Sequence, residues 1–182
     1  MKIALKYGAF MALAAAAFTL VMYFAGYHES MEKMKSAQAI GFVGGFGIAV
    51  TLLALAMKEA RASAPIDNDW GYGNAFGTGA LTAVFAALFG AVFGYCYFAF
   101  INPGFSEAVM QGQMAALEAK GMTAAQLERA EPMMRKWMSP PLMTCMQAVS
   151  AFIMSTILSA IVAIFFKKRE ESMGSAVPPV AG

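Results

Sequence analysis

This chain carries little charge for its length. Of its 182 residues only 13% are Asp, Glu, Lys or Arg, against about 25% in soluble proteins. It has one histidine and two cysteines, so a disulfide framework and a cluster of Cys and His metal ligands are both excluded. The 13 basic and 11 acidic residues nearly balance, so the strongly basic surface of a nucleic-acid-binding protein is missing as well.

The chain is instead rich in apolar sequence, which makes up 59% of the residues. The apolar residues gather in four long runs, at about residues 7–27, 36–57, 74–101 and 142–166. Each run is long enough to cross about 30 Å of hydrocarbon as a helix. We therefore expect an all-α polytopic membrane protein with four transmembrane helices, formed by residues 1–169. Residues 170–182 are small, proline-bearing and uncharged after Glu171, and are expected to form a disordered cytoplasmic tail.

The first run follows Lys2 and Lys6, as the apolar part of a signal peptide would. It is longer than the usual apolar stretch of about 7–15 residues in a signal peptide, so we expect an uncleaved anchor. Basic residues beside the runs predict the orientation of the chain. Lys58, Arg61 and the cluster 167–169 favour the cytoplasm for both termini.

Small residues recur every four positions along the runs. Apolar lipid gives helices no hydrophobic reason to associate, so close packing depends on such small residues. We therefore expect a compact four-helix bundle, with a small-residue stripe left for a partner. The residues expected to pack helices together are Gly8, Ala12, Gly41, Gly45, Gly90, Gly94, Ser155 and Ser159.

Residues 102–141 separate the third and fourth runs and show a helical pattern of their own. Gly121 is placed to end one helix, because glycine readily takes the left-handed cap conformation. Thr123 and Gln126 have the spacing of a capping box that starts a second helix, which Pro132 is expected to kink or shorten. We expect an extramembrane amphipathic hairpin with a methionine-rich face, since methionine adapts to irregular partners.

The order of several short motifs resembles the bacterial DUF4199 family. In the hairpin region these are NPGF, then GMTAAQLE, then MMRKWMSP, and elsewhere MKIALKYG, KEARA and GYGNAFGTG. The resemblance extends from the start of the chain to about Lys168. It implies a four-span protein of the bacterial inner membrane, with no established activity and no catalytic or ligand-binding residue to carry over.

The runs hold no charged side chain in their interiors, which argues against a proton-coupled transporter. The only histidine, His28, has no adjacent carboxylate or nucleophile and is interpreted as a solvated residue at the membrane boundary. Hydrolytic catalysis needs a nucleophile and a base within hydrogen-bonding reach. We therefore expect no enzymatic activity, no catalytic residue and no cofactor.

Soft sulfur ligands raise one metal hypothesis, that of a copper site. Candidate ligands lie near the predicted outer face of the membrane, where the hairpin is expected. They are His28, Met31, Met34, Met143, Cys145 and Met146. Sixteen methionines spread over the chain are more typical of packing, so no metal site is assigned. Cys96 and Cys145 are interpreted as thiols that pack in the bundle, and a disulfide bond between them is the alternative.

Two functional hypotheses follow. In the first, the protein is a non-enzymatic membrane protein that contacts other membrane subunits or itself. In the second, it is a small oligomeric channel or transporter that uses the polar residues Gln147, Ser150 and Ser155 of the last run. Copper handling is a minor third alternative. The bilayer is the common partner in all three, and neither nucleic acid nor a soluble substrate is expected.

Overall fold

The computed structural model describes residues 1–65 and 70–166, and these residues form helices and connecting turns without a strand. The elements in chain order are α1 (Lys2–Phe24), α2 (Met31–Ala62), α3 (Tyr72–Cys96), the π-helix η1 (Tyr97–Ile101), α4 (Phe105–Ala119), α5 (Ala124–Trp137) and α6 (Pro140–Phe166). The all-α prediction is therefore confirmed. The predicted tail 170–182 and the basic cluster 167–169 lie outside the described residues.

Four helices are long and apolar enough to cross a membrane, namely α1, α2, α6 and the continuous pair α3–η1. This confirms the four membrane-spanning candidates expected from composition. The helix α2 extends beyond the apolar run 36–57 at both ends, because local signals set its limits. At its start the side chain of Ser30 accepts a hydrogen bond from the backbone N–H of Lys33 at 3.4 Å, which satisfies a donor that the first helical turn leaves free.

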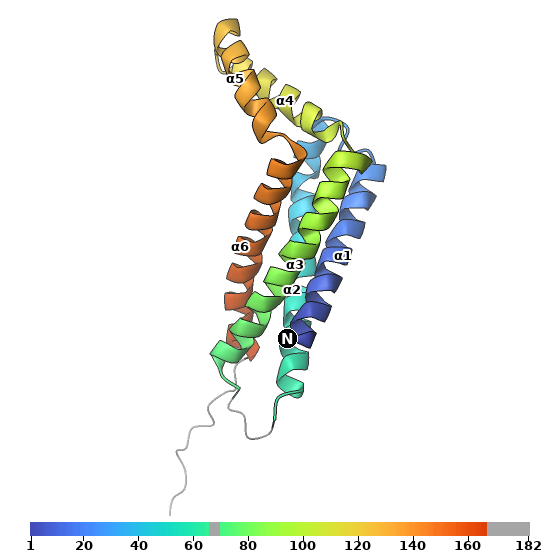
Figure 1. Cartoon of the computed structure of the whole chain (residues 1–182), viewed down its shortest axis with the longest axis vertical. Coiled ribbons are helices and arrows are strands. Elements are labelled where there is room, and N and C mark those ends of the chain that lie inside the picture. Colours follow the sequence, from blue (N-terminus) through green and yellow to red (C-terminus); the bar gives the residue numbers. More distant parts are fainter. Residues whose placement is uncertain (66–69, 167–182) are drawn as a thin grey trace, which may run out of the picture.

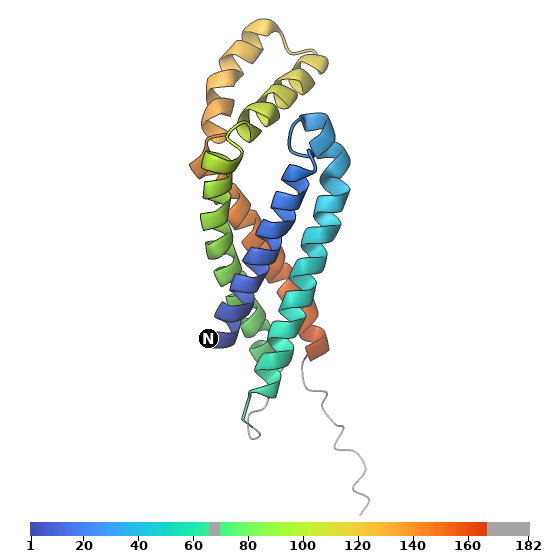
Figure 2. The same cartoon turned by 90° about the vertical axis from the view of Figure 1, so that its right-hand side faces the viewer.

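The bundle is organised around α3. This helix packs most extensively on α6 and α1 and also contacts α2, and Figure 2 shows α6 crossing the other three helices diagonally. The N-terminus lies at one end of the bundle and the α4–α5 hairpin projects from the other (Figure 1). We call these the N-terminal end and the hairpin end.

The N-terminal end contains an apolar cluster where α2, α3 and α6 meet. Its buried cluster consists of Met57, Trp70, Ala75, Val162 and Ala163. The indole Nε1–H of Trp70 also donates to the carbonyl oxygen of Phe166 at 3.1 Å, which joins the start of α3 to the end of α6. Two transmembrane candidates that are distant in sequence are thus fixed to each other at this end.

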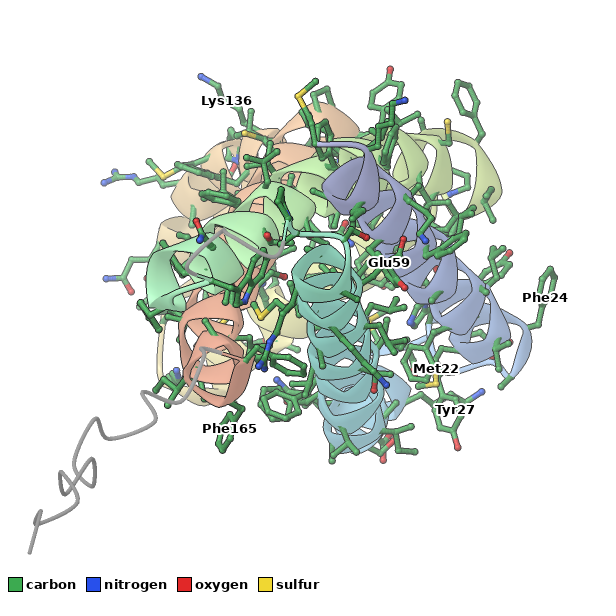
Figure 3. All side chains as sticks on the ribbon, turned by 90° about the horizontal axis from the view of Figure 1, so that it is seen from below. Met22, Phe24, Tyr27, Glu59, Lys136 and Phe165 are labelled. Carbon is green, nitrogen blue, oxygen red and sulfur yellow. The ribbon has the colours of Figure 1, made fainter. Side chains whose placement is uncertain are left out.

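A charged pair joins α1 to α2 at the same end. The ammonium group of Lys6 lies 2.6 Å from a carboxylate oxygen of Glu59, and the hydroxyl of Tyr7 donates to the same carboxylate at 2.8 Å. Figure 3 shows Glu59 between α1 and α2, whereas Phe24 and Phe165 point away from the bundle. Exposed ion pairs of this kind contribute about 0–1 kcal/mol each to folding stability. The pair therefore aligns the ends of α1 and α2 but adds little to the stability of the bundle.

Small residues make close helix contacts at some of the expected positions. A Cβ atom added to Gly8 of α1 would lie 2.5 Å from the Cβ of Phe85 and 3.0 Å from the carbonyl oxygen of Thr82, both on α3. Ala12 and Ser155 are buried. Ser159 is fully buried on α6, and its hydroxyl donates to the carbonyl oxygen of Phe76 at 3.2 Å.

Other glycines of the expected set have open surroundings. A Cβ atom added to Gly41, Gly45 or Gly90 would find no described atom within 4 Å. Gly94 differs, because its added Cβ would lie 3.1 Å from Oε1 of Gln147. The small residues at this spacing on α1 and α6 therefore pack against other helices of the bundle, whereas Gly41 and Gly45 of α2 have open surroundings.

The hairpin forms through its local turn signals. Gly121 has φ of +91°, in the region that favours glycine. The backbone N–H of Thr123 donates to Oε1 of Gln126 at 2.9 Å, as in a capping box. Pro132 lies within α5, which continues unbroken to Trp137. Hence the proline, expected to kink or shorten this helix, does not end it.

Candidate binding cavity at the hairpin end

The hairpin end of the bundle contains the candidate binding site. A cavity of about 570 Å³ lies among the hairpin ends of α1, α3 and α6, beneath the bases of α4 and α5. Its lining is mainly aromatic and sulfur-bearing, with three polar side chains, and consists of Thr19, His28, Phe93, Gly94, Tyr97, Phe98, Phe105, Val109, Trp137, Met138, Met143, Met146 and Gln147. No Asp, Glu, Lys or Arg is among these residues, so the cavity suits an uncharged occupant.

A hydrogen-bonded chain of three side chains forms one wall. Nδ1 of His28 lies 2.5 Å from the hydroxyl oxygen of Tyr97, and the side-chain amide of Asn102 donates to that oxygen at 3.1 Å. Tyr97 is only 2% exposed, so its O–H needs a partner inside the protein. All three groups are satisfied when Tyr97 donates to Nδ1 of His28, which leaves the histidine proton on Nε2.

His28 is therefore not the solvated boundary residue that its sequence position suggested. It is half-buried, and its ring lies against Tyr97 and Phe105, with centroids 5.8 and 5.6 Å away. This burial lowers the pKa of His28 below its ordinary value of 6.5, because desolvation disfavours the imidazolium. The ring is neutral at pH 7 and offers one N–H donor.

The π-helix η1 places Tyr97 in this wall. It ends where the backbone N–H of Asn102 donates to the carbonyl oxygen of Tyr97 at 2.8 Å, directly before Pro103. π-Helical turns are rare and are frequent at functional sites. Sequence reasoning missed both Tyr97 and Asn102, although the NPG stop and the aromatic run YCYFAF were the visible signals.

Gln147 of α6 lies between this cavity and a smaller one. The second cavity, of about 110 Å³, lies between α1, α3 and α6, and Gln147 lines both. Except for Met11 and Gln147 its lining is small, and consists of Ala12, Ala15, Ala86, Ala87, Gly90, Ala148, Ala151 and Ser155. The side chain of Gln147 is exposed, and its amide makes no hydrogen bond to a described residue, so it is available to a ligand.

A third cavity, of about 400 Å³, opens between α1 and α2. It shares Thr19, His28 and Phe105 with the first cavity, and Gly41 and Gly45 line it from α2. The first cavity thus adjoins the other two. The open glycines of α2 lie beside the third cavity.

The candidate copper ligands are only partly brought together. His28, Met143 and Met146 line the first cavity, while Met34 lines the third. Cys145 is exposed, as is Cys96, and both are free thiols; the side chain of Met31 lies outside what the structure describes. Within residues 1–65 and 70–166, no three His, Cys, Asp or Glu side chains cluster as metal ligands would.

Comparison with known proteins gives one match. The family described as "Protein of unknown function (DUF4199)" matches residues 6–168, which is most of the chain. No curated protein and no solved structure matches it. The residues that build the cavity all lie within the matched range.

Proposed function

Because the chain belongs to the DUF4199 family, whose description gives no activity, we propose a function from its geometry: it is a non-enzymatic integral membrane protein that assembles with another membrane subunit or with a second copy of itself. We place it in the bacterial inner membrane with both termini in the cytoplasm. Lys2, Lys6, Lys58 and Arg61 support this orientation, since they belong to the N-terminal end of the bundle.

The observation that carries this proposal is the open glycine pair of α2. Gly41 and Gly45 stand one helical turn apart, and neither would bring an added Cβ within 4 Å of a described atom. Gly44 beside them is different, since the ring of Phe18 fills its space. A glycine pair at this spacing lets a second transmembrane helix approach closely.

Lipid contact alone is a poor reason for these glycines. Glycine inside a helix is less favourable than alanine by about 0.5–1 kcal/mol, and it presents no side chain to the acyl chains. Neighbouring positions that face outward carry large side chains instead, such as Phe42, Val43 and Phe46. The pair therefore favours a helix partner, which would lie along α2 beside the third cavity.

The hairpin supplies a second surface for assembly. Helix α4 buries Met110, whereas α5 has no buried residue and exposes Met133 and Trp137. We propose that the hairpin is amphipathic, lies outside the membrane on the non-cytoplasmic side, and presents the apolar face of α5 to a partner or to the lipid surface.

The test replaces the glycine pair and follows assembly. Native mass spectrometry of the full chain, extracted from its own membrane in mild detergent, should show a defined complex. The variant with Gly41→Leu and Gly45→Leu should lose it, because two leucines would keep the partner helix away. Both side chains enter open space, so the isolated chain should still fold.

Gly47→Leu is the matched control, since Gly47 has equally open surroundings on the same helix but points to a different face. It should leave the complex intact. A wild-type chain that extracts only as a monomer, or a complex that survives both leucines, would contradict the proposal.

The channel alternative has one supporting observation. Gln147 and Ser155 both line the second cavity, whereas Ser150 is exposed and lines none of the three cavities. Below that cavity the bundle is filled by Leu53 and Met57, both fully buried. One amide and one hydroxyl beside a cavity of about 110 Å³ do not make a continuous polar path, so assembly is the better supported function.

A further inference from the structure

We propose that the first and second cavities, which adjoin at Gln147, bind a neutral amphiphile of the quinone class, with a carbonyl-bearing ring in the first cavity and an apolar chain in the second. This small-molecule site goes beyond the assembly proposed above and uses different residues. It follows from three properties of the cavities: their shape, their polar groups and their lack of charge.

The first cavity has the dimensions and lining of a ring site. Its volume of about 570 Å³ falls within the range of about 300–1,000 Å³ that is usual for ligand pockets. Phe93, Phe98, Phe105 and Trp137 supply aromatic surface from α3, η1, α4 and α5. Aromatic rings prefer offset or edge-on contact with other rings, so a flat ring matches this lining better than a flexible acyl chain does.

Two polar groups are free to hold the carbonyl oxygens of such a ring. His28 has its Nδ1 engaged by Tyr97, so its Nε2–H is the available donor. The amide of Gln147 lacks a partner among the described residues and lines the cavity from α6. Two donors from different parts of the chain suit a molecule with two acceptors, and both donors are uncharged.

The second cavity suits the chain of the ligand. It begins at Gln147, runs between α1, α3 and α6, and is lined by alanines with Gly90 and Ser155. At about 110 Å³ it is much smaller than the first cavity, and its apolar lining suits a short hydrocarbon segment. The ring would thus lie at the hairpin end, and its chain would point toward the middle of the bundle.

The experiment measures binding of a benzoquinone with a decyl chain to the full-length protein in phosphatidylethanolamine–phosphatidylglycerol nanodiscs. The chain has two tryptophans; Trp137 lines the first cavity, whereas Trp70 belongs to the packed cluster at the N-terminal end. We expect saturable quenching of tryptophan fluorescence, lost in the Trp137→Phe variant.

Two substitutions test the polar groups. Gln147→Leu removes the amide, and His28→Asn removes the Nε2–H donor while retaining an oxygen that can accept the Tyr97 proton. Each should raise the dissociation constant about tenfold, the effect of losing one such hydrogen bond. Ser150→Leu, on the same helix as Gln147 but outside the cavities, is the matched control and should leave binding unchanged.

Decylbenzene, which has the ring and the chain but no carbonyl, should compete at least tenfold more weakly than the quinone. Quenching that rises without saturation would mean simple partition into the bilayer and would overturn the proposal. Equal competition by decylbenzene, or dissociation constants unaffected by both substitutions, would mean that the cavity takes up hydrocarbon without recognising carbonyl groups. Either result would overturn the proposal. Because the Gly41 and Gly45 variants leave these donors in place, failure of either proposal can be told from failure of the other.

Discussion

Gly79 and Gly90 lie on the same helix, α3, and differ in what surrounds them. A Cβ atom added to Gly79 would collide with the hydroxyl of Ser159 and the methyl group of Met57, both in the closely packed half of the bundle. A Cβ atom added to Gly90 would find no described atom within 4 Å, since Gly90 lines the second cavity.

Gly79→Ala should therefore destabilise the bundle by about 1–3 kcal/mol, the usual cost of overpacking. Gly90→Ala should be neutral or slightly stabilising, because alanine is the better helix former. Unfolding of the two purified variants in a graded detergent series, followed by circular dichroism, measures the difference. Equal destabilisation of both would contradict the difference between the surroundings of Gly79 and Gly90.

Gly79 also shows the limit of reading glycines from spacing. It was not among the expected packing residues, yet it makes the closest glycine contact of α3. Gly90, which was among them, makes no such contact with a described residue. Spacing identifies positions on one helix face, but which face meets a neighbour depends on the rotation of each helix in the bundle.

At the level of elements, the α4–α5 hairpin depends on a single left-handed residue. Gly121 has φ of +91° with open space around it, so an added side chain would be strained by the backbone conformation alone. Gly121→Ala should cost about 1–2 kcal/mol, the penalty of that conformation for an L-residue.

The loss should be confined to the hairpin and appear as faster amide hydrogen exchange in α4 and α5, with the bundle unchanged. Gly104→Ala is the control, because Gly104 precedes α4 with φ of −74°, which alanine adopts freely. Slower exchange in the bundle core than in the hairpin is expected in both variants. If Gly104→Ala were as damaging as Gly121→Ala, backbone strain would not be the cause.

Over the whole molecule, the separation of the two ends gives a test of orientation. Ser63 directly follows α2 at the N-terminal end, and Gly121 lies at the tip of the hairpin. With Cys96 and Cys145 replaced by alanine, Ser63→Cys and Gly121→Cys give two single-cysteine chains.

A membrane-impermeant maleimide added to intact spheroplasts should label the cysteine at position 121 at once. It should label the cysteine at position 63 only after permeabilisation, because a charged reagent does not cross the hydrocarbon core. The reverse pattern would invert the proposed orientation, and labelling of both positions in sealed cells would contradict a membrane-spanning bundle.

The sequence by itself determined the class of the protein and its local structure. Four apolar runs of spanning length leave the helix as the structure that satisfies every backbone group in lipid, and the all-α fold with four such helices followed. The hairpin turn at Gly121 and Thr123 also depends on residues close in the chain, so local reasoning was sufficient there.

Only the tertiary structure decided where the molecule is hollow. His28 and Tyr97 are 69 positions apart, and nothing in the local sequence of either predicts that they share a hydrogen bond. Their meeting depends on how α1 and α3 rotate and cross, which is set by contacts such as that of Gly8 with Phe85. Gln147 likewise lines a cavity with residues of α1 and α3, because packing between helices acts across the fold.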